Sequence, residues 1–200
     1  MQNSLINKAN EIISILKEIP TVKGCVLYGS LSTNTYDEFS DIDIEVDVSG
    51  SDNGQFMLDV AYLLKNRVDI WYSDYAPSLI PDKYIVSLAI DAENPFRIID
   101  LCCYAEPHCT TVTKQQAAAM NDKCTHTLKV WIANLKHYVR GQECYDDIAK
   151  MARRLSIADV DVKEEAELLE ETLCWLEENH ENNLYEYIQS CRRVFEDLVK

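Results

Sequence analysis

Basic residues are scarce in this sequence. It has 19 Lys and Arg against 34 Asp and Glu, which gives a formal net charge of −15 over 200 residues. A strongly acidic surface repels polyanions and attracts cations. The balance therefore argues against a long nucleic acid as a partner and favours a small or cationic molecule, the alternative being that the acidity serves only solubility.

Long apolar runs and an export signal are also missing. No stretch approaches the roughly eighteen consecutive apolar residues of a membrane-spanning helix, so we expect no membrane association through such a helix. The first residues, Met1 to Lys8, lack a basic region followed by an apolar stretch, and a signal peptide is not expected. Eight cysteines without an export signal, none of them in a Cys-x-x-Cys pair, then indicate reduced thiols in a cytoplasmic protein.

Proline is absent after residue 107, and the composition changes at about residue 112. The part before it has strand patterns, among them Val68 to Tyr72, then a loop through Pro81, then two strands at 84–90 and 97–104 that should pair as an antiparallel hairpin. The part after it has helical patterns, including one from Lys114 that ends at Gly141. We therefore predict an α+β fold, with a mixed-sheet domain at 1–112 and a helical bundle at 113–200.

One stretch near the start of the chain combines a short apolar strand with a strict alternation of acidic and apolar residues. Cys25 to Tyr28 is apolar and is followed by Gly29 and Ser30, where small residues let a backbone approach a ligand closely. Residues 41–46 then read Asp-Ile-Asp-Ile-Glu-Val. Period two places the three acids on one face of a strand, where they repel each other unless a cation such as Mg²⁺ lies between them.

A third acid is found in a later strand. Asp100 interrupts the apolar run from Arg97 to Cys103. A lone carboxylate in a strand of this kind is costly without a partner. This makes Asp100 a candidate to join the acidic face of the earlier strand.

These motifs together resemble the polymerase-beta-like nucleotidyltransferase superfamily. Its pattern is an apolar strand, Gly-Ser or Gly-Gly, a spacer of about a dozen residues, then Asp-apolar-Asp, with a third acid on a later strand. The resemblance implies a mixed sheet with flanking helices and assigns Asp41 and Asp43 as metal ligands. It assigns Gly29 and Ser30 as contacts to the nucleotide phosphates, and Asp100 as both a metal ligand and the base that takes the acceptor proton.

Within that superfamily the sequence is most similar to bacterial antibiotic nucleotidyltransferases, the aminoglycoside 6-adenylyltransferase and lincosamide groups. The features that carry this similarity are Gly29-Ser30, Ser40 to Asp43, the hairpin that ends in Arg97 to Leu101, and an aromatic-rich helix at Trp131. The isoleucine pair before Asp100 departs from the Arg-Ile-Asp-Leu of the aminoglycoside group. The departure concerns the acceptor and not the chemistry.

The resemblance implies a Mg²⁺-dependent enzyme that moves a nucleoside monophosphate, AMP from ATP, to a hydroxyl of a small and cationic acceptor such as an antibiotic. The helical half would contribute to the acceptor site. One alternative is a minimal nucleotidyltransferase of a toxin–antitoxin pair, which modifies a protein or RNA. Another is a catalytically silent nucleotide-binding module. The sequence leaves open whether the protein is a monomer or a homodimer.

Overall fold

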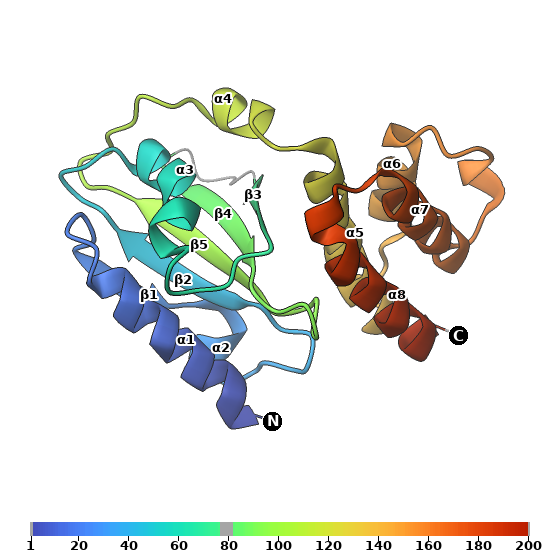
Figure 1. Ribbon diagram of the computed structural model, residues 1–200, viewed down its shortest axis with the longest axis horizontal. Coiled ribbons are helices and arrows are strands. Elements are labelled where there is room, and N and C mark those ends of the chain that lie inside the picture. Colours follow the sequence, from blue (N-terminus) through green and yellow to red (C-terminus); the bar gives the residue numbers. More distant parts are fainter. Residues whose placement is uncertain (1, 77–81, 200) are drawn as a thin grey trace. The chain divides into compact units, whose positions relative to one another are not determined.

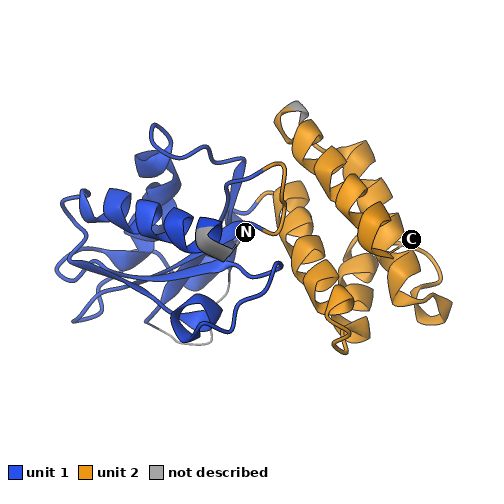
Figure 2. Ribbon diagram, turned by 90° about the horizontal axis from the view of Figure 1, so that it is seen from below, with its two compact units in different colours: residues 1–91, 97–121 blue, residues 92–96, 122–200 orange. Residues whose placement is uncertain are grey.

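The chain forms two compact units in a computed structural model that describes residues 2–76 and 82–199. Unit 1 comprises residues up to 91 together with 97–121, and unit 2 comprises residues 92–96 and 122 onward (Figure 2). The division thus lies at residue 121, whereas the composition changes near 112. The loop expected to end at Pro81 lies outside the described residues.

Unit 1 is built on a five-stranded mixed sheet with the order β1-β2-β5-β4-β3 (Figure 1). The strands are β1 (Gly24–Leu27), β2 (Ile42–Asp47), β3 (Tyr72–Ala76), β4 (Tyr84–Ala89) and β5 (Ile98–Tyr104). β2 and β5 are parallel, and all other neighbouring pairs are antiparallel. The expected antiparallel hairpin is therefore confirmed as β4 and β5, and the α+β class is confirmed with it.

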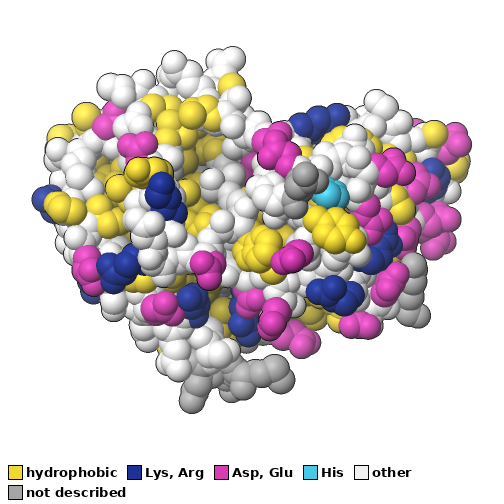
Figure 3. Space-filling view, in the orientation of Figure 1, with side chains coloured by type: hydrophobic (Ala, Val, Ile, Leu, Met, Phe, Trp, Pro, Cys, Tyr) yellow, Lys and Arg dark blue, Asp and Glu magenta, His cyan; other side chains and the backbone are white. Residues whose placement is uncertain are grey.

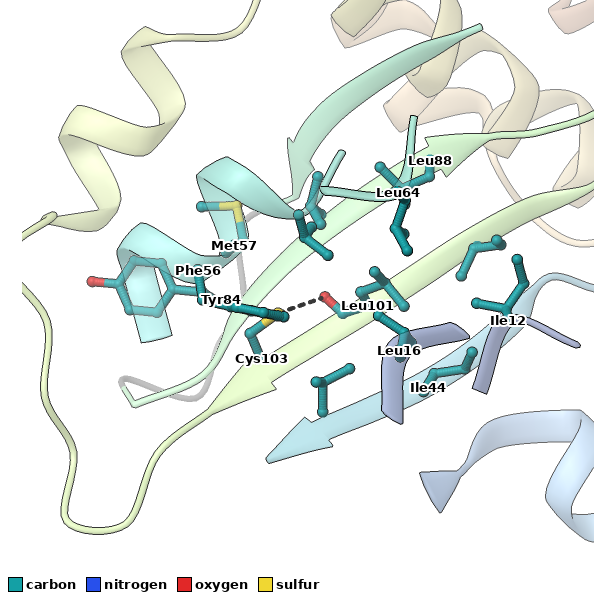
Figure 4. Close-up of a cluster of buried hydrophobic side chains, with 14 of the residues drawn as sticks. Ile12, Leu16, Ile44, Phe56, Met57, Leu64, Tyr84, Leu88, Leu101 and Cys103 are labelled. Atoms are coloured by element: carbon teal, nitrogen blue, oxygen red, sulfur yellow. Dashed lines mark hydrogen bonds between the residues drawn. The ribbon is translucent and has the colours of Figure 1, made fainter. Parts of the chain in front are cut away.

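Two helices cover one face of this sheet. α1 (Gln2–Lys17) and α3 (Asn53–Leu64) lie on the same side of it in Figure 1. The close-up in Figure 4 shows how Leu16 of α1, Ile44 of β2 and Leu101 of β5 meet in the core between these layers, and all three are fully buried. Because side chains alternate along a strand, the residues between these apolar positions point to the opposite face.

The edge strand β3 starts later than the sequence pattern predicts. The strand expected at Val68 to Tyr72 is wrong except for its last residue, because β3 runs from Tyr72 to Ala76. Val68 is buried, but it closes the turn after α3, where its N–H donates to the carbonyl of Leu64 (2.9 Å). Its apolar character therefore reflects burial under the helix and not strand pairing.

The outer edge of β3 is met by a side chain from the segment after α4 (Lys114–Ala119). The Asn121 amide donates to the carbonyl of Tyr75 (2.9 Å) and accepts from its N–H (2.8 Å). An amide side chain that pairs with both backbone groups of one residue imitates a neighbouring strand and blocks further pairing there. This contact ties α4 and Asn121 to the sheet.

Unit 2 is the predicted helical bundle, which is confirmed. Its helices are α5 (Lys123–Val139), α6 (Tyr145–Arg154), α7 (Glu165–Asn179) and α8 (Tyr185–Val199), with short 3₁₀ turns at Val160–Val162 and Asn182–Leu184. Trp131 of α5 is fully buried, donates from its indole N–H to the carbonyl of Leu169 (2.9 Å) and lies 6.1 Å from the ring of Phe195. The tryptophan thus joins α5, α7 and α8.

The long helix expected from Lys114 to Gly141 is two helices, α4 and α5. Asp122 interrupts it, because its carboxylate accepts the backbone N–H groups of Cys124 (2.8 Å) and Thr125 (3.0 Å) and so starts a new helix. The predicted end at Gly141 is confirmed. This glycine has a φ of +66°, directly after the last residue of α5 and its cap Arg140.

Negative charge is spread over the face of the molecule that Figure 3 shows. On the face shown in Figure 3, acidic side chains occur singly and in small groups on both units, with Lys and Arg between them. In the described part of the chain, no helix has the length and apolar character that crossing a bilayer requires.

Candidate active site

The strand β2 has two unlike faces, as its alternating sequence predicts. Ile42, Ile44 and Val46 are fully buried in the core under α1 and α3. Asp43 and Glu45, which lie between them, are half-buried on the opposite face. The two carboxylates therefore stand on the side of the sheet that these helices do not cover.

Asp100 lies beside Asp43 on this face. β2 and β5 pair in a register that sets Asp43 directly opposite Asp100, in neighbouring parallel strands. Adjacent strands are about 4.8 Å apart, so the two side chains are neighbours. The structure thus brings together two of the three predicted acids, which are 57 positions apart in the sequence.

Gly29 packs against the carboxylate of Asp43. Its φ is +63°, a backbone conformation that favours glycine, and a Cβ built on it would collide with Asp43 Oδ2 and lie 2.9 Å from Cγ. The N–H of the preceding residue, Tyr28, donates to the Asp43 carbonyl (3.1 Å). The turn after β1 is therefore fitted to Asp43, and a side chain at position 29 would displace the carboxylate.

Ser30 follows within the short helix α2 (Gly29–Thr33). This turn is closed by Ser32 and Thr33, whose hydroxyls donate to the Gly29 carbonyl (2.8 and 3.3 Å). Within the described part of the chain, the Ser30 hydroxyl itself takes part in no hydrogen bond. It is half-buried next to Gly29.

Asp41 lies just before the start of β2 and is half-buried. The loop that leads to it is held by Asp37, which accepts a hydrogen bond from the hydroxyl of Ser40 (2.7 Å) and another from the N–H of Phe39 (3.0 Å). Ser40 is itself buried. The loop conformation next to Asp41 is thereby fixed by side-chain hydrogen bonds.

Glu45, on the same face of β2 as Asp43, has a cationic partner. The ammonium of Lys83 forms an ion pair and hydrogen bond with the Glu45 carboxylate and lies 5.5 Å from the centre of the Tyr104 ring. The bond to Glu45 is the main cause that raises the pKa of Lys83 above its usual value. The carboxylate of Glu45 is therefore engaged by a lysine of the same protein.

Two neighbours of the acids were not singled out from the sequence. Tyr28 is half-buried, and the pKa of its phenol is raised, first by burial and then by nearby charges, of which that of Asp43 contributes most. Ser87 of β4 is fully buried and donates to Asp100 Oδ1 (2.5 Å). The signals for them were the position of Tyr28 directly before Gly29 and the position of Ser87 between apolar residues of its strand.

Carboxylates are suitable ligands for a hard divalent cation, but the acids do not supply a complete set of metal ligands by themselves. Among residues 2–76 and 82–199, no three His, Cys, Asp or Glu side chains are grouped closely enough to hold a metal ion by themselves. Mg²⁺ commonly binds to one or two carboxylates and completes its octahedral shell with substrate phosphates and water. Asp43 and Asp100 meet that requirement, and Asp41 is placed two residues before Asp43.

Comparison with known proteins agrees with this geometry. Residues 10–87 match the family model described as "Polymerase beta, Nucleotidyltransferase", a range that includes Gly29, Ser30, Asp41 and Asp43 and ends before Asp100. A search of curated proteins gave no significant match.

One similar solved structure is titled "structure of GLD-2/RNP-8 complex". Its sequence identity to this chain is 14%, and the TM-score is 0.39. The alignment covers 98% of this chain and 58% of that one, so the chain spans little more than half of that protein's length. Residues 10–87 are therefore similar to this nucleotidyltransferase family, and the mixed sheet with its flanking helices is the fold predicted from the resemblance.

Proposed function

We propose that the protein is a Mg²⁺-dependent nucleotidyltransferase that moves a nucleoside monophosphate, AMP from ATP, to a hydroxyl of a small acceptor. The observation that carries the proposal is the position of Asp43 opposite Asp100 on parallel strands, with Gly29 packed against Asp43. Two adjacent carboxylates beside a turn without a side chain are suited to a cation and the phosphates that it accompanies.

The proposed reaction needs metal ligands, contacts to the phosphates and a general base. Asp41, Asp43 and Asp100 hold the metal, and the Gly29-Ser30 turn contacts the phosphates. The acceptor hydroxyl oxygen forms a bond to the α-phosphorus, the bond from that phosphorus to the bridging oxygen breaks, and pyrophosphate leaves. Asp100 takes the hydroxyl proton as a general base. Mg²⁺ supplies charge neutralisation for the phosphates and orientation for the reacting oxygens.

The acceptor in this proposal is a small cationic molecule, for which an aminoglycoside or a lincosamide antibiotic is the leading candidate. The net charge of −15 favours a cation over a polyanion. Acceptor specificity would depend on residues 113–200, because loops and added domains are where function varies on a shared fold.

A second candidate function is nucleotide binding without turnover. It is favoured by one observation, namely that the family match spans residues 10–87 and so does not include Asp100. A silent module of this kind would bind a nucleotide and show no Mg²⁺-dependent release of pyrophosphate.

The test is an assay of pyrophosphate release with Mg²⁺, each of the four nucleoside triphosphates, and a panel of aminoglycosides and lincosamides. Mass spectrometry of the acceptor identifies the product, which for ATP carries one added AMP. Acceptor-dependent release supports the proposal and names the acceptor class. Nucleotide binding by calorimetry with no release on any acceptor favours the silent module, and modification of a co-purified protein or RNA instead favours the toxin–antitoxin alternative.

A further inference from the structure

Polar side chains form a row across four strands of the sheet. The registers of β2, β5, β4 and β3 set Asp43 opposite Asp100, Asp100 opposite Ser87, and Ser87 opposite Asp74. Residues that are direct partners in adjacent strands point to the same face of a sheet. The hydroxyl of Ser87 therefore lies next to the candidate metal ligand Asp100, although the nucleotidyltransferase motifs do not include Ser87.

Ser87 is fixed by its surroundings. It has no exposed surface, and its strand neighbours Val86 and Leu88 are buried in the apolar core on the other face. A buried hydroxyl is costly unless it forms a hydrogen bond, and the only described bond of Ser87 is the one that it donates to Asp100 Oδ1 (2.5 Å). The hydroxyl is thus committed to that one oxygen.

Because of this bond, the two carboxylate oxygens of Asp100 have different surroundings. Oδ1 accepts from Ser87, and within the described residues Oδ2 takes part in no hydrogen bond. A hydrogen bond from a buried strand residue to one carboxylate oxygen restricts the side-chain torsions of Asp100, and the second oxygen is left for a ligand. Preorganisation of this kind lowers the cost of assembling a site when the ligand binds.

We propose that Ser87 is a positioning residue, which acts through Asp100 by holding Oδ1 so that Oδ2 is presented to the metal and to the acceptor proton. The inference rests on the proposed function, because it assigns Asp100 the roles given there. Ser87 itself contacts neither the metal nor the acceptor. Its contribution is the fixed geometry of its neighbour.

The test compares Ser87→Ala with Ser87→Thr and with Ser190→Ala. Ser190 is a matched control, since it is also buried (2% exposed) and donates to a backbone carbonyl, that of Glu93 (3.4 Å), in unit 2. Two readouts are required: kcat and KM for the nucleotide, and calorimetric affinity for Mn²⁺ in the presence of a non-hydrolysable ATP analogue. Thermal unfolding of each variant reports its stability separately.

Loss of a hydrogen bond to a charged group predicts a fall of kcat by about 10- to 100-fold in Ser87→Ala. We expect KM for the nucleotide to stay within about twofold, because the phosphate contacts are elsewhere. Mn²⁺ affinity should fall several-fold, Ser87→Thr should recover both properties, and Ser190→Ala should change neither.

The outcomes separate this inference from the proposed function. Turnover by the unmodified protein with unchanged kcat and Mn²⁺ affinity in Ser87→Ala overturns the role of Ser87 alone. If the unmodified protein binds Mn²⁺ with the nucleotide analogue but does not turn over, the proposed function falls, and the Mn²⁺ affinity of Ser87→Ala still decides the inference. An unmodified protein that binds no Mn²⁺ overturns both.

Discussion

The carboxylate of Asp43 occupies the space where a side chain of Gly29 would lie. A Cβ at position 29 would collide with Oδ2 and come within 2.9 Å of Cγ, and the backbone there has a φ of +63°. Two separate requirements, for a positive φ and for an empty space, therefore fall on one glycine. The turn after β1 and the acidic face of β2 are built as a single unit.

Gly29→Ala is expected to reduce activity by displacing Asp43. Gly141→Ala is the matched control, since Gly141 has nearly the same φ of +66° but a Cβ at that position would meet nothing within 4 Å. Both variants should lose about 1 kcal/mol of stability from the unfavourable φ, measured by denaturant unfolding. Only Gly29→Ala should also lose metal and nucleotide binding by calorimetry, and equal binding in the two variants would contradict the fit between Gly29 and Asp43.

Glu45 should be dispensable for turnover although it shares the face of Asp43. Its carboxylate is paired with Lys83, and both side chains are partly exposed, at 30% and 27%. Exposed or partly exposed pairs of this kind contribute about 0–1 kcal/mol. We expect Glu45→Gln to keep kcat within about fivefold, since about 1 kcal/mol corresponds to a change of less than about tenfold in a rate or equilibrium constant. The variant should also unfold at nearly the same denaturant concentration as the unmodified protein. A complete loss of activity would place Glu45 among the metal ligands instead.

The free energy of unfolding should decrease as the pH is lowered, because Asp52, which caps α3, becomes protonated. Its carboxylate accepts from the N–H of Gln55 (2.8 Å) and from the N–H and hydroxyl of Thr111 (2.6 Å each). Burial raises the pKa of Asp52, but the hydrogen bonds together lower it by more than burial raises it. The net shift of the pKa is therefore downward. A depressed pKa in the folded state means that the contribution is present above the unfolded pKa of about 3.9 and is lost as the pH falls through the folded value.

Asp52→Ala should therefore cost about 1 kcal/mol of stability at pH 7, because Asp52 is only half-buried and solvent screens its interactions. The difference in free energy of unfolding between this variant and the unmodified protein should shrink as the pH falls below the unfolded pKa of about 3.9 and through the lower folded value. Asp69, an exposed aspartate without a described partner, supplies the control variant Asp69→Ala. A difference that does not change between neutral pH and this acidic range would show that the carboxylate charge is not what stabilises the cap.

Arg192 joins α7 and α8 in unit 2. Its guanidinium forms two parallel bonds with Glu177, from Nε and Nη2 at 2.8 Å each, and a further one from Nη1 to Glu170. Lysine cannot reproduce this fork, and the site is partly buried, with 15% of the Arg192 side chain exposed. Arg192→Lys should destabilise the protein by about 1–2 kcal/mol in chemical unfolding.

Arg153→Lys is the control for that prediction. Arg153 also pairs with an acid, Asp161 (2.5 Å), but the two side chains are 52% and 83% exposed. An exposed pair is screened by water, and this variant should change stability by less than about 0.5 kcal/mol. Similar losses in the two variants would mean that the fork of Arg192 is not special.

The parts of the fold that sequence reasoning predicted are those with a strong local pattern. The alternation at residues 41–46 predicted both faces of β2, and the apolar run around Asp100 predicted β5. The hairpin of β4 and β5 followed from its turn residues. These predictions depend on hydrophobic periodicity, which can be recognised in the sequence of a single strand without knowledge of its partners.

The errors arose where tertiary contacts decide. Val68 is apolar because it is buried beneath α3, so that its segment imitates a strand without being one. The break between α4 and α5 depends on the cap formed by Asp122, which lies within a continuous helical pattern. The register that sets Ser87 beside Asp100 depends on how two strands pair. No local pattern contains that information, and Ser87 was therefore missed.

The most direct test of the proposed catalytic centre is Mg²⁺-dependent pyrophosphate release from ATP by Asp43→Asn, measured beside Asp69→Asn on the acceptor that supports turnover. The substitution keeps the size of the side chain and removes its charge, so that both variants should fold. If Asp43 holds the metal, its variant should lose at least about 100-fold in rate, whereas Asp69→Asn should match the unmodified protein. Equal rates in the two variants would contradict the assignment of this acidic face as the catalytic centre.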